Sequence, residues 1–207
     1  MILTEDWVFC HIPRTGGTNF SVRCLKAYAR TDQGYTGFFN DLHFKHQPIS
    51  YWKRQIPHTQ DLPWITLIRN PYARYVSLFY LGHKEGYFDK SYIFEEFVKD
   101  RKDETSQIKL KTSGKFISAD KWLYLRSVGV EYDPTWQMTK YIEDDEVKTF
   151  RLEDQLEEME EYVGFKFTDT RFNETKHDPW ETYYTEELRE IVYERYQEDF
   201  ERFSYER

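Results

Sequence analysis

The 207-residue chain is poor in cysteine and lacks the segments that usually join separate domains. Its 2 cysteines, Cys10 and Cys24, are too few for a disulfide framework. Both lie in apolar segments, so we expect reduced thiols within the core. The sequence contains no internal repeat, no Gly/Ser-rich linker and no low-complexity tract. At this length we therefore expect a single domain over residues 1–207, with a sizeable hydrophobic core.

Long apolar runs are also absent from the sequence. No stretch approaches the roughly 18 apolar residues that a membrane-spanning helix needs. Glu5 and Asp6 stand where a secretory signal peptide would carry basic and then apolar side chains. These two absences predict a cytoplasmic protein without a membrane span. The aromatic content of 19% is in turn too high for an intrinsically disordered chain.

Basic residues are in overall deficit, and the formal net charge of −8 at pH 7 argues against a general nucleic-acid-binding protein. The deficit lies in the last quarter of the chain. Residues 151–207 hold 18 acidic and 8 basic side chains, whereas residues 1–150 hold 19 acidic and 21 basic ones. We interpret the acidic excess as the solvated faces of C-terminal helices. The near-neutral remainder is compatible with a site for an anionic ligand.

The sequence does contain a regular alternation of strand and helix patterns. Apolar runs predict buried strands over residues 7–12, 64–68 and 147–152, and apolar spacing predicts helices after each run, over 91–99, around 122–125 and from Leu188 to Phe203. Asn70 and Pro71 suit the N-cap and first position of the helix after the second strand. This order predicts an α/β fold of three layers, in which helices cover both faces of a central parallel sheet.

The turn after the first predicted strand has the chemistry of an anion site. Residues 11–19 read His-Ile-Pro-Arg-Thr-Gly-Gly-Thr-Asn, so a glycine-containing turn leads directly into a helix. Such a turn directs backbone N–H groups and the positive end of the helix dipole at one point. Thr15 and Thr18 add hydroxyl groups, and Arg14 adds a fork of charged donors suited to phosphate or sulfate oxygens. An ordinary strand–turn–helix connection would also use the glycines.

A second basic segment follows the next predicted strand. Arg69 stands at the end of that strand, and Ser77 lies in the second turn of the following helix. Ligands of open α/β sheets bind beyond the carboxyl ends of the strands, where Arg69 would join Arg14. Arg69 and Ser77 could then hold a second phosphate group. We expect Arg74 to be a surface or ion-paired residue.

These two segments together resemble the sulfotransferases that use 3′-phosphoadenosine 5′-phosphosulfate (PAPS). Residues 13–18 are similar to that family's 5′-phosphosulfate loop, commonly P-K-T-G-[GT]-T. Residues 69–77 are similar to its 3′-phosphate motif, R-[DN]-P-x-x-R-x-x-S, with the spacing from Arg to Ser intact. The stretch from Tyr183 to Phe200 resembles the tail of the branch that contains Golgi carbohydrate sulfotransferases and small bacterial and viral relatives. The resemblance implies a P-loop-like sulfotransferase fold.

The resemblance also implies a set of donor-binding residues and no metal requirement. The implied residues are Arg14, Thr15, Gly16, Gly17, Thr18, Asn19, Arg69, Ser77 and Asn173. The chain departs from the family at Arg14, because most members have Lys there, and the family Lys contacts the 5′-phosphate and assists the leaving group. Arg keeps the charge but is not a compact point charge, so we expect donor binding to be retained. The sequence shows no metal-ligand spacing either.

A histidine between the two motifs is the candidate general base, because its ordinary pKa lies near neutrality. His43 and His46 both lie there. In the resembling branch a His commonly precedes a Pro-containing segment before the second strand, which favours His46, ahead of Gln47-Pro48. We expect His11, His58, His83 and His177 to be structural.

The resulting hypothesis is an enzyme that moves the sulfuryl group of PAPS to a hydroxyl of a small-molecule or carbohydrate acceptor and leaves 3′-phosphoadenosine 5′-phosphate (PAP). A nucleotide kinase or other phosphate-transfer enzyme is an alternative, although residues 11–19 lack the Lys of a Walker A loop. A non-catalytic PAPS-binding module with Arg14 in place of Lys is another. The net charge disfavours a long polyanionic acceptor, which would need a broad basic groove. The sequence leaves the acceptor and the oligomeric state undetermined.

Overall fold

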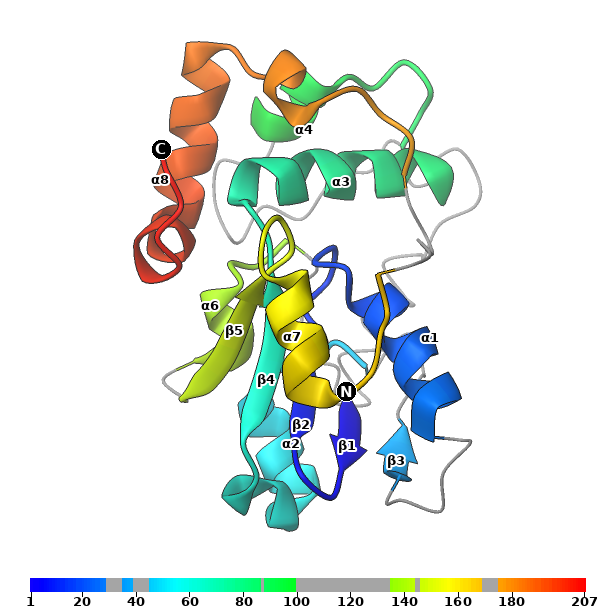
Figure 1. Cartoon of the computed structure of the whole chain (residues 1–207). Coiled ribbons are helices and arrows are strands. Elements are labelled where there is room, and N and C mark those ends of the chain that lie inside the picture. The colour runs from blue at the N-terminus through cyan, green and yellow to red at the C-terminus, as the bar shows by residue number, and fades with distance from the viewer. Residues whose placement is uncertain (29–34, 39–44, 87, 100–134, 144–145, 169–174) are drawn as a thin grey trace. The chain divides into compact units, whose positions relative to one another are not determined.

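The packing of the chain forms two compact units. The computed structural model describes residues 1–28, 35–38, 45–86, 88–99, 135–143, 146–168 and 175–207 (Figure 1). Of these, the first unit contains the residues up to Arg69 and those from Met138 to Thr168, and the second contains 70–99, 135–137 and 175–207. The single domain expected over residues 1–207 stays a prediction.

The first unit is built on a five-stranded sheet. Its order is β3 (Tyr35–Phe38), β1 (Ile2–Thr4), β2 (Val8–Cys10), β4 (Trp64–Ile68) and β5 (Val147–Arg151). β2, β4 and β5 run parallel, with Val8 opposite Trp64 and Ile68 opposite Arg151. β1 is antiparallel to both β2 and β3. Every residue of β2 and β4 is buried, which explains their continuous apolar sequences.

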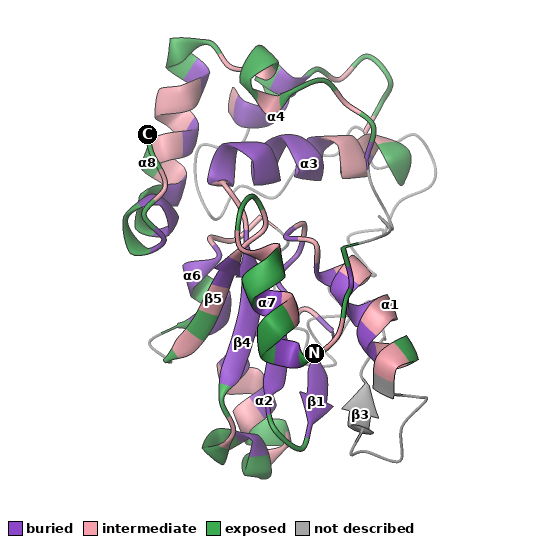
Figure 2. Cartoon of the chain, viewed as in Figure 1, coloured by how far each residue is buried: buried purple, intermediate pink, exposed green. Residues whose placement is uncertain are grey.

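Helices α1 (Gly17–Tyr28) and α7 (Leu156–Val163) share one hydrophobic cluster with one face of this sheet. Phe9 of β2 packs against Phe20 of α1 with ring centroids 4.3 Å apart. Phe20 is fully buried, and truncating such a side chain to Ala in a core costs about 3–5 kcal/mol. Figure 2 shows the strands β1, β2 and β4 in purple and the outward face of α7 in green, as expected for a solvated acidic helix surface.

Helix α6 (Thr139–Ile142) contacts the sheet at Cys10, the neighbour of Phe9 in β2. Neighbouring strand residues point to opposite faces. Cys10 therefore points away from the α1 face, and its Sγ lies 4.0 Å from the carbonyl oxygen of Tyr141 in α6. α2 (Ile49–Gln55) packs against α6 and leads into the short helix η1 (Pro57–Asp61). The sheet thus has helices on both faces.

The second unit is helical and rich in aromatic side chains. It contains α3 (Pro71–Lys84), α4 (Phe94–Lys99), η2 (Trp180–Tyr183) and α8 (Glu186–Arg202). Every residue from Pro71 to Phe79 is buried, because α4, η2 and α8 all pack on α3. Tyr72 shows this packing: its ring stacks on Trp180 with centroids 5.4 Å apart, and its carbonyl oxygen accepts a hydrogen bond from Tyr184.

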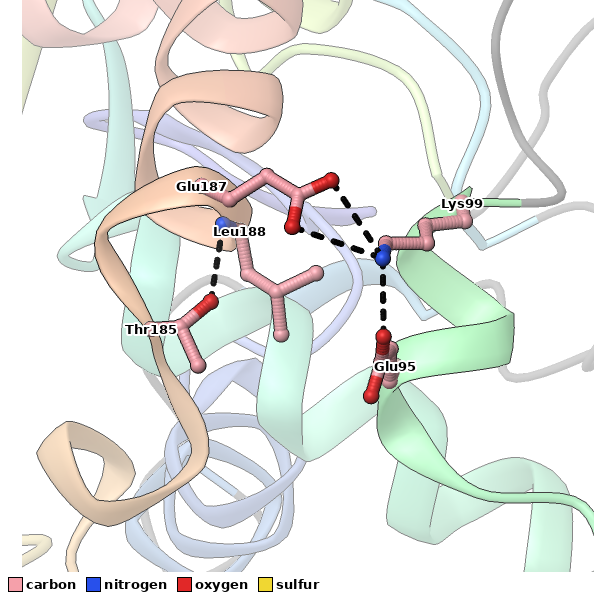
Figure 3. A network of polar contacts seen from close by, with 5 residues as sticks. All are labelled: Glu95, Lys99, Thr185, Glu187 and Leu188. Atoms are coloured by element: carbon pink, nitrogen blue, oxygen red, sulfur yellow. Dashed lines mark hydrogen bonds and ion pairs between the residues drawn. The ribbon is translucent and has the colours of Figure 1, made fainter.

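A charged network on the surface of this unit joins α4 to the start of α8 (Figure 3). Nζ of Lys99 lies 2.7 Å from a carboxylate oxygen of Glu95 and 3.3 Å from one of Glu187. The hydrogen bond to Glu95 and that to Glu187 raise the pKa of Lys99. Thr185 caps α8, and its Oγ1 accepts from the backbone N–H of Leu188 at 3.3 Å. The exposed ion pairs orient the two helix ends, whereas the apolar cluster beneath them provides the cohesion.

The structure confirms the α/β class with parallel central strands and helices on both faces. β4 has the predicted bounds, and α3 begins as expected with Asn70 as its N-cap and Pro71 in its first turn. The antiparallel strands β1 and β3 were not predicted, because strands of three and four residues are too short to show a clear alternating pattern. The helix predicted around 122–125 lies outside the described residues.

Three smaller expectations have clear outcomes. Cys10 and Cys24 are free and buried, as predicted. The expectation of a surface position for Arg74 is wrong: its side chain is 1% exposed, and Nη1 donates to the carbonyl oxygen of Trp136 at 2.8 Å. None of the helices in the described part of the chain is long and apolar enough to cross a bilayer.

Replacing Asn70 should destabilise the protein through loss of a helix cap. The Oδ1 of Asn70 accepts hydrogen bonds from the N–H groups of Tyr72 and Ala73 at 2.9 and 3.3 Å. Asn70→Ala leaves both donors without this acceptor, and should lower the free energy of unfolding by about 1 kcal/mol, measured by urea denaturation. Asn70→Ser is the matched control because a hydroxyl can still cap, and it should retain most of the stability. Equal losses in the two variants would contradict the capping role.

Candidate active site

The loop between β2 and α1 turns through two left-handed residues. Arg14 has φ 66° and Gly16 has φ 88°. This conformation costs a non-glycine residue about 1–2 kcal/mol, so the surrounding structure must hold Arg14 in place. The carbonyl oxygen of Gly16 then accepts from the N–H groups of Asn19 and Phe20 at 3.0 and 3.3 Å and starts α1. The loop therefore leads into a helix N-terminus, as the sequence predicts.

Thr15 holds the turn together from inside. Its side chain is fully buried, and Oγ1 donates to the carbonyl oxygen of Ile12 at 3.0 Å. The single hydroxyl proton of Thr15 is thus used within the loop. The expected role of Thr15 in donor binding stays a prediction. Thr18, in the first turn of α1, is half-buried.

Neighbouring side chains lie so close to both loop glycines that a larger residue at either position would displace them. A Cβ on Gly16 would lie 2.7 Å from Cδ1 of Leu152, which follows β5. A Cβ on Gly17 would lie 2.3 Å from Cδ2 and 2.5 Å from Nε2 of His11. Side chains pack over the loop from two sides, and only glycine allows this approach without a shift. A glycine-containing turn that leads into a helix N-terminus is the type of backbone that binds anions through its N–H groups.

Arg14 and Arg69 originate at the same edge of the sheet. β2 and β4 run parallel, so the residues that follow them leave the sheet at the same end. Nη1 of Arg69 lies 3.4 Å from the carbonyl oxygen of Arg14, which places the Arg69 guanidinium against the loop. Both arginines are half-buried. Two half-buried arginines at one sheet edge, next to a helix N-terminus, suit a phosphate- or sulfate-bearing ligand.

His46 is oriented by a hydrogen bond to the strand that precedes the loop. Its Nδ1 lies 2.7 Å from the carbonyl oxygen of His11, and the two imidazole rings meet edge-on with centroids 4.5 Å apart. A carbonyl oxygen can only accept, so Nδ1 of His46 must carry the proton of this bond. In the neutral ring, the lone pair is then on Nε2. His46 is half-buried, and Nε2 can act as a proton acceptor.

The side chain of Asn19 contacts a segment outside the loop. Its Nδ2 donates to the carbonyl oxygen of Phe167 at 2.6 Å and so joins α1 to the segment after α7. Phe20, the next residue, packs against the ring of Phe167 with centroids 5.2 Å apart. The expected role of Asn19 in donor binding stays a prediction, and these contacts give it a second function in docking the helix.

Ser77 belongs to the second unit, where it lies in the interior of α3. Its side chain is 1% exposed, and its Oγ lies 3.5 Å from Oγ1 of Thr175. The hydroxyl of Ser77, in the segment that the 3′-phosphate motif covers, therefore lies beside a second buried hydroxyl that is distant in the sequence. Two candidates, His43 and Asn173, lie outside the described residues.

Sequence reasoning missed two residues of these sites. His11 was expected to be structural only, yet it contacts both the loop glycine and His46. The strand alternation contained a signal, because His11 shares a face with Phe9, and that face is covered by α1. Thr175 had no signal of this kind, since 98 residues separate it from Ser77.

No group of three or more His, Cys, Asp and Glu side chains within the described residues is placed to hold a metal ion. The chemistry that these residues offer is anion binding by N–H groups and guanidinium groups, together with proton acceptance by an imidazole. This set suits a donor with phosphate and sulfate groups and an acceptor that loses a proton.

Replacing Gly16 tests the close packing of the loop. Gly16→Ala introduces both an unfavourable φ and a methyl group that meets Leu152. Gly164→Ala is a matched control in the same unit, because its φ is 76° and nothing lies within 4 Å of the added Cβ. Both variants should lose about 1–2 kcal/mol of unfolding free energy through the backbone alone. Gly16→Ala should lose more unfolding free energy than Gly164→Ala because of the contact with Leu152, and this extra loss should disappear in a Leu152→Ala background. An equal loss of unfolding free energy in the two glycine variants would contradict the packing.

Comparison with known proteins agrees with this chemistry. Searches of curated proteins and of solved structures find no match to the chain. A family model, described as the sulfotransferase family, matches residues 4–206. The match spans both units, and it includes the loop of Arg14, the strand end at Arg69 and helix α3. The chain therefore belongs to the sulfotransferase family.

Proposed function

We propose that this sulfotransferase uses PAPS as its donor and a hydroxyl group of a small molecule or carbohydrate as its acceptor. Family membership supports sulfuryl transfer in general. The observation that carries the finer proposal is the contact between the Arg69 guanidinium and the loop of Arg14, 3.4 Å from Nη1 to the carbonyl oxygen. It brings both basic motif segments to one sheet edge, as a donor with two separate phosphate-bearing ends requires.

The charge of the two arginines and the glycine loop support a donor with phosphate and sulfate groups. The N–H groups at the start of α1 and the guanidinium of Arg14 would hold the 5′-phosphosulfate, where glycine allows the backbone to approach closely. Arg69 would hold the 3′-phosphate, and Ser77 is the other residue that the family motif implies for this group. When bound, PAPS supplies a sulfuryl group on a phosphate leaving group. Arg14 and the loop N–H groups stabilise the negative charge that develops on the leaving phosphate oxygen.

His46 would accept the proton of the acceptor hydroxyl. As the hydroxyl oxygen bonds to sulfur, the bond from sulfur to the bridging oxygen breaks, and its electron pair stays on the phosphate of PAP. The hydroxyl proton moves to Nε2 of His46, while Nδ1 keeps its hydrogen bond to the carbonyl oxygen of His11. That carbonyl stabilises the resulting imidazolium, because hydrogen bonds from a charged donor are stronger than neutral ones.

Replacing Arg69 should weaken donor binding without unfolding the protein. Loss of a charge-assisted hydrogen bond should raise the dissociation constant for PAP by about 10- to 100-fold, measured by calorimetry. Arg54→Ala removes an exposed cation from α2 of the same unit and should leave PAP affinity unchanged. Thermal unfolding of Arg69→Ala should remain cooperative. Wild-type affinity in Arg69→Ala would contradict the donor assignment, and displacement of PAP by ATP would favour a phosphate-transfer enzyme instead.

Replacing His46 should remove turnover and spare donor binding. His46→Ala should lower the rate of radiolabelled sulfate transfer from PAPS to phenolic, sugar and steroid hydroxyls by about 100- to 10,000-fold, as loss of a general base does. Its PAP affinity should stay within about threefold of wild type. Exposed His58 provides the matched control, since His58→Ala should retain full activity. Retained turnover in His46→Ala would exclude it as the base, and PAP binding without transfer by the wild type would favour a non-catalytic binding module.

A further inference from the structure

The buried imidazole of His11 lies between the two functional parts of the first unit. Its side chain is 4% exposed, and it occupies the space where any side chain on Gly17 would begin. Nε2 and Cδ2 of the ring thus lie directly against the first residue of α1. Any movement of this ring must be accompanied by a movement of the loop or of the first turn of the helix.

The same residue contacts His46 through both its backbone and its ring. The carbonyl oxygen of His11 accepts from Nδ1 of His46 at 2.7 Å, which sets the tautomer of His46. The ring meets the His46 ring at an interplanar angle of 69°, which restricts rotation about the side-chain bonds of His46. One residue therefore sets both which nitrogen of His46 has a lone pair and where that lone pair points.

His11 is suited to this role because it stays neutral. Burial, together with the neighbouring His46, the amino group of Met1 and Lys45, lowers the pKa of His11 well below its usual range. A charged imidazole at this position would oppose the formation of an imidazolium on His46. A neutral ring allows His46 to accept a proton without that repulsion.

We propose that His11 is a positioning residue that couples the donor loop to the general base, by packing against Gly17 on one side and orienting His46 on the other. The inference rests on the proposed function, in which His46 takes the acceptor proton beside a donor held by the loop. Its physical basis is the sensitivity of group transfer to geometry, since a misplacement of about 1 Å can cost on the order of 100-fold in rate.

A double-mutant cycle between His11 and Gly17 tests the packing half of the proposal. Gly17→Ala should lower kcat by about tenfold or more, because the methyl group displaces the His11 ring. His11→Ala should lower kcat to a similar extent, with PAP affinity within about threefold of wild type. The double variant should be no worse than either single one, because the space left by the ring accommodates the methyl group. Multiplicative losses in the double variant would overturn the coupling.

A second cycle asks whether His11 acts through His46. In a His46→Ala background, His11→Ala should cause no further loss of the residual turnover, since the group that it positions is gone. A residue that only stabilises the fold would cause the same loss in both backgrounds, and that result would overturn the proposal. His11→Phe retains a buried ring against Gly17 and should recover activity toward the wild-type rate. Full kcat in a folded His11→Ala would also overturn it.

Nitrogen NMR of the imidazoles, without donor or acceptor, separates this inference from the proposed function. His11→Ala keeps the backbone carbonyl of residue 11, so both proteins should show the Nδ1-protonated tautomer of His46. Loss of the His11 ring should instead shift the Nε2 and ring-proton signals of His46, with unchanged thermal unfolding. His83→Ala is a control, because it removes a half-buried histidine of the second unit and should leave the His46 signals unchanged. Unchanged Nε2 and ring-proton signals of His46 in His11→Ala would overturn the positioning role. Failure of wild-type protein to bind PAP would overturn the proposed function, while the NMR result would still decide whether His11 orients His46.

Discussion

The parallel pairing of β2 with β4 is the constraint on which the candidate site depends. Val8, Phe9 and Cys10 lie opposite Trp64, Ile65 and Thr66, and the buried hydroxyl of Thr66 donates to the carbonyl oxygen of Cys10 at 2.8 Å. This register brings the loop after β2 and the strand end at Arg69 to one edge. A slip of one residue would exchange the two faces of β2 and move Phe9 away from α1. The arginine contact at the edge thus follows from hydrophobic pairing deep in the sheet.

Close approach of backbone and side chain is the second organising feature of the first unit. Leu152 packs over Gly16, and the ring of His11 packs over Gly17. Residues that follow β2 and β5 therefore both contact this one short turn. Arg14, which precedes these two glycines, has a left-handed backbone conformation. The surrounding structure maintains this conformation, although it is unfavourable for a residue other than glycine. A loop defined in this way would lose little entropy on binding the proposed donor, because its shape exists beforehand.

Much of the fold and part of the site could be predicted because local chemistry decides them. β4 is a continuous apolar run, and Asn70-Pro71 is a helix start wherever it occurs, so both were recognised within a few residues. The buried position of Arg74 could not be predicted, since a charged residue on a helix is ordinarily solvated. Its burial depends on the carbonyl group of Trp136, which is distant in the sequence and supplies the acceptor.

The sequence by itself determined the alternation of strands and helices, the glycine turn with its arginine, and the family to which the chain belongs, because each depends on residue type at short spacing. Only the tertiary structure decided which of these residues meet. His46 is 35 residues from His11, and Gly17 is on another element, yet burial of the Phe9 face of β2 under α1 brings all three together. Contacts of this kind arise from packing of nonlocal apolar surfaces, which no local pattern specifies.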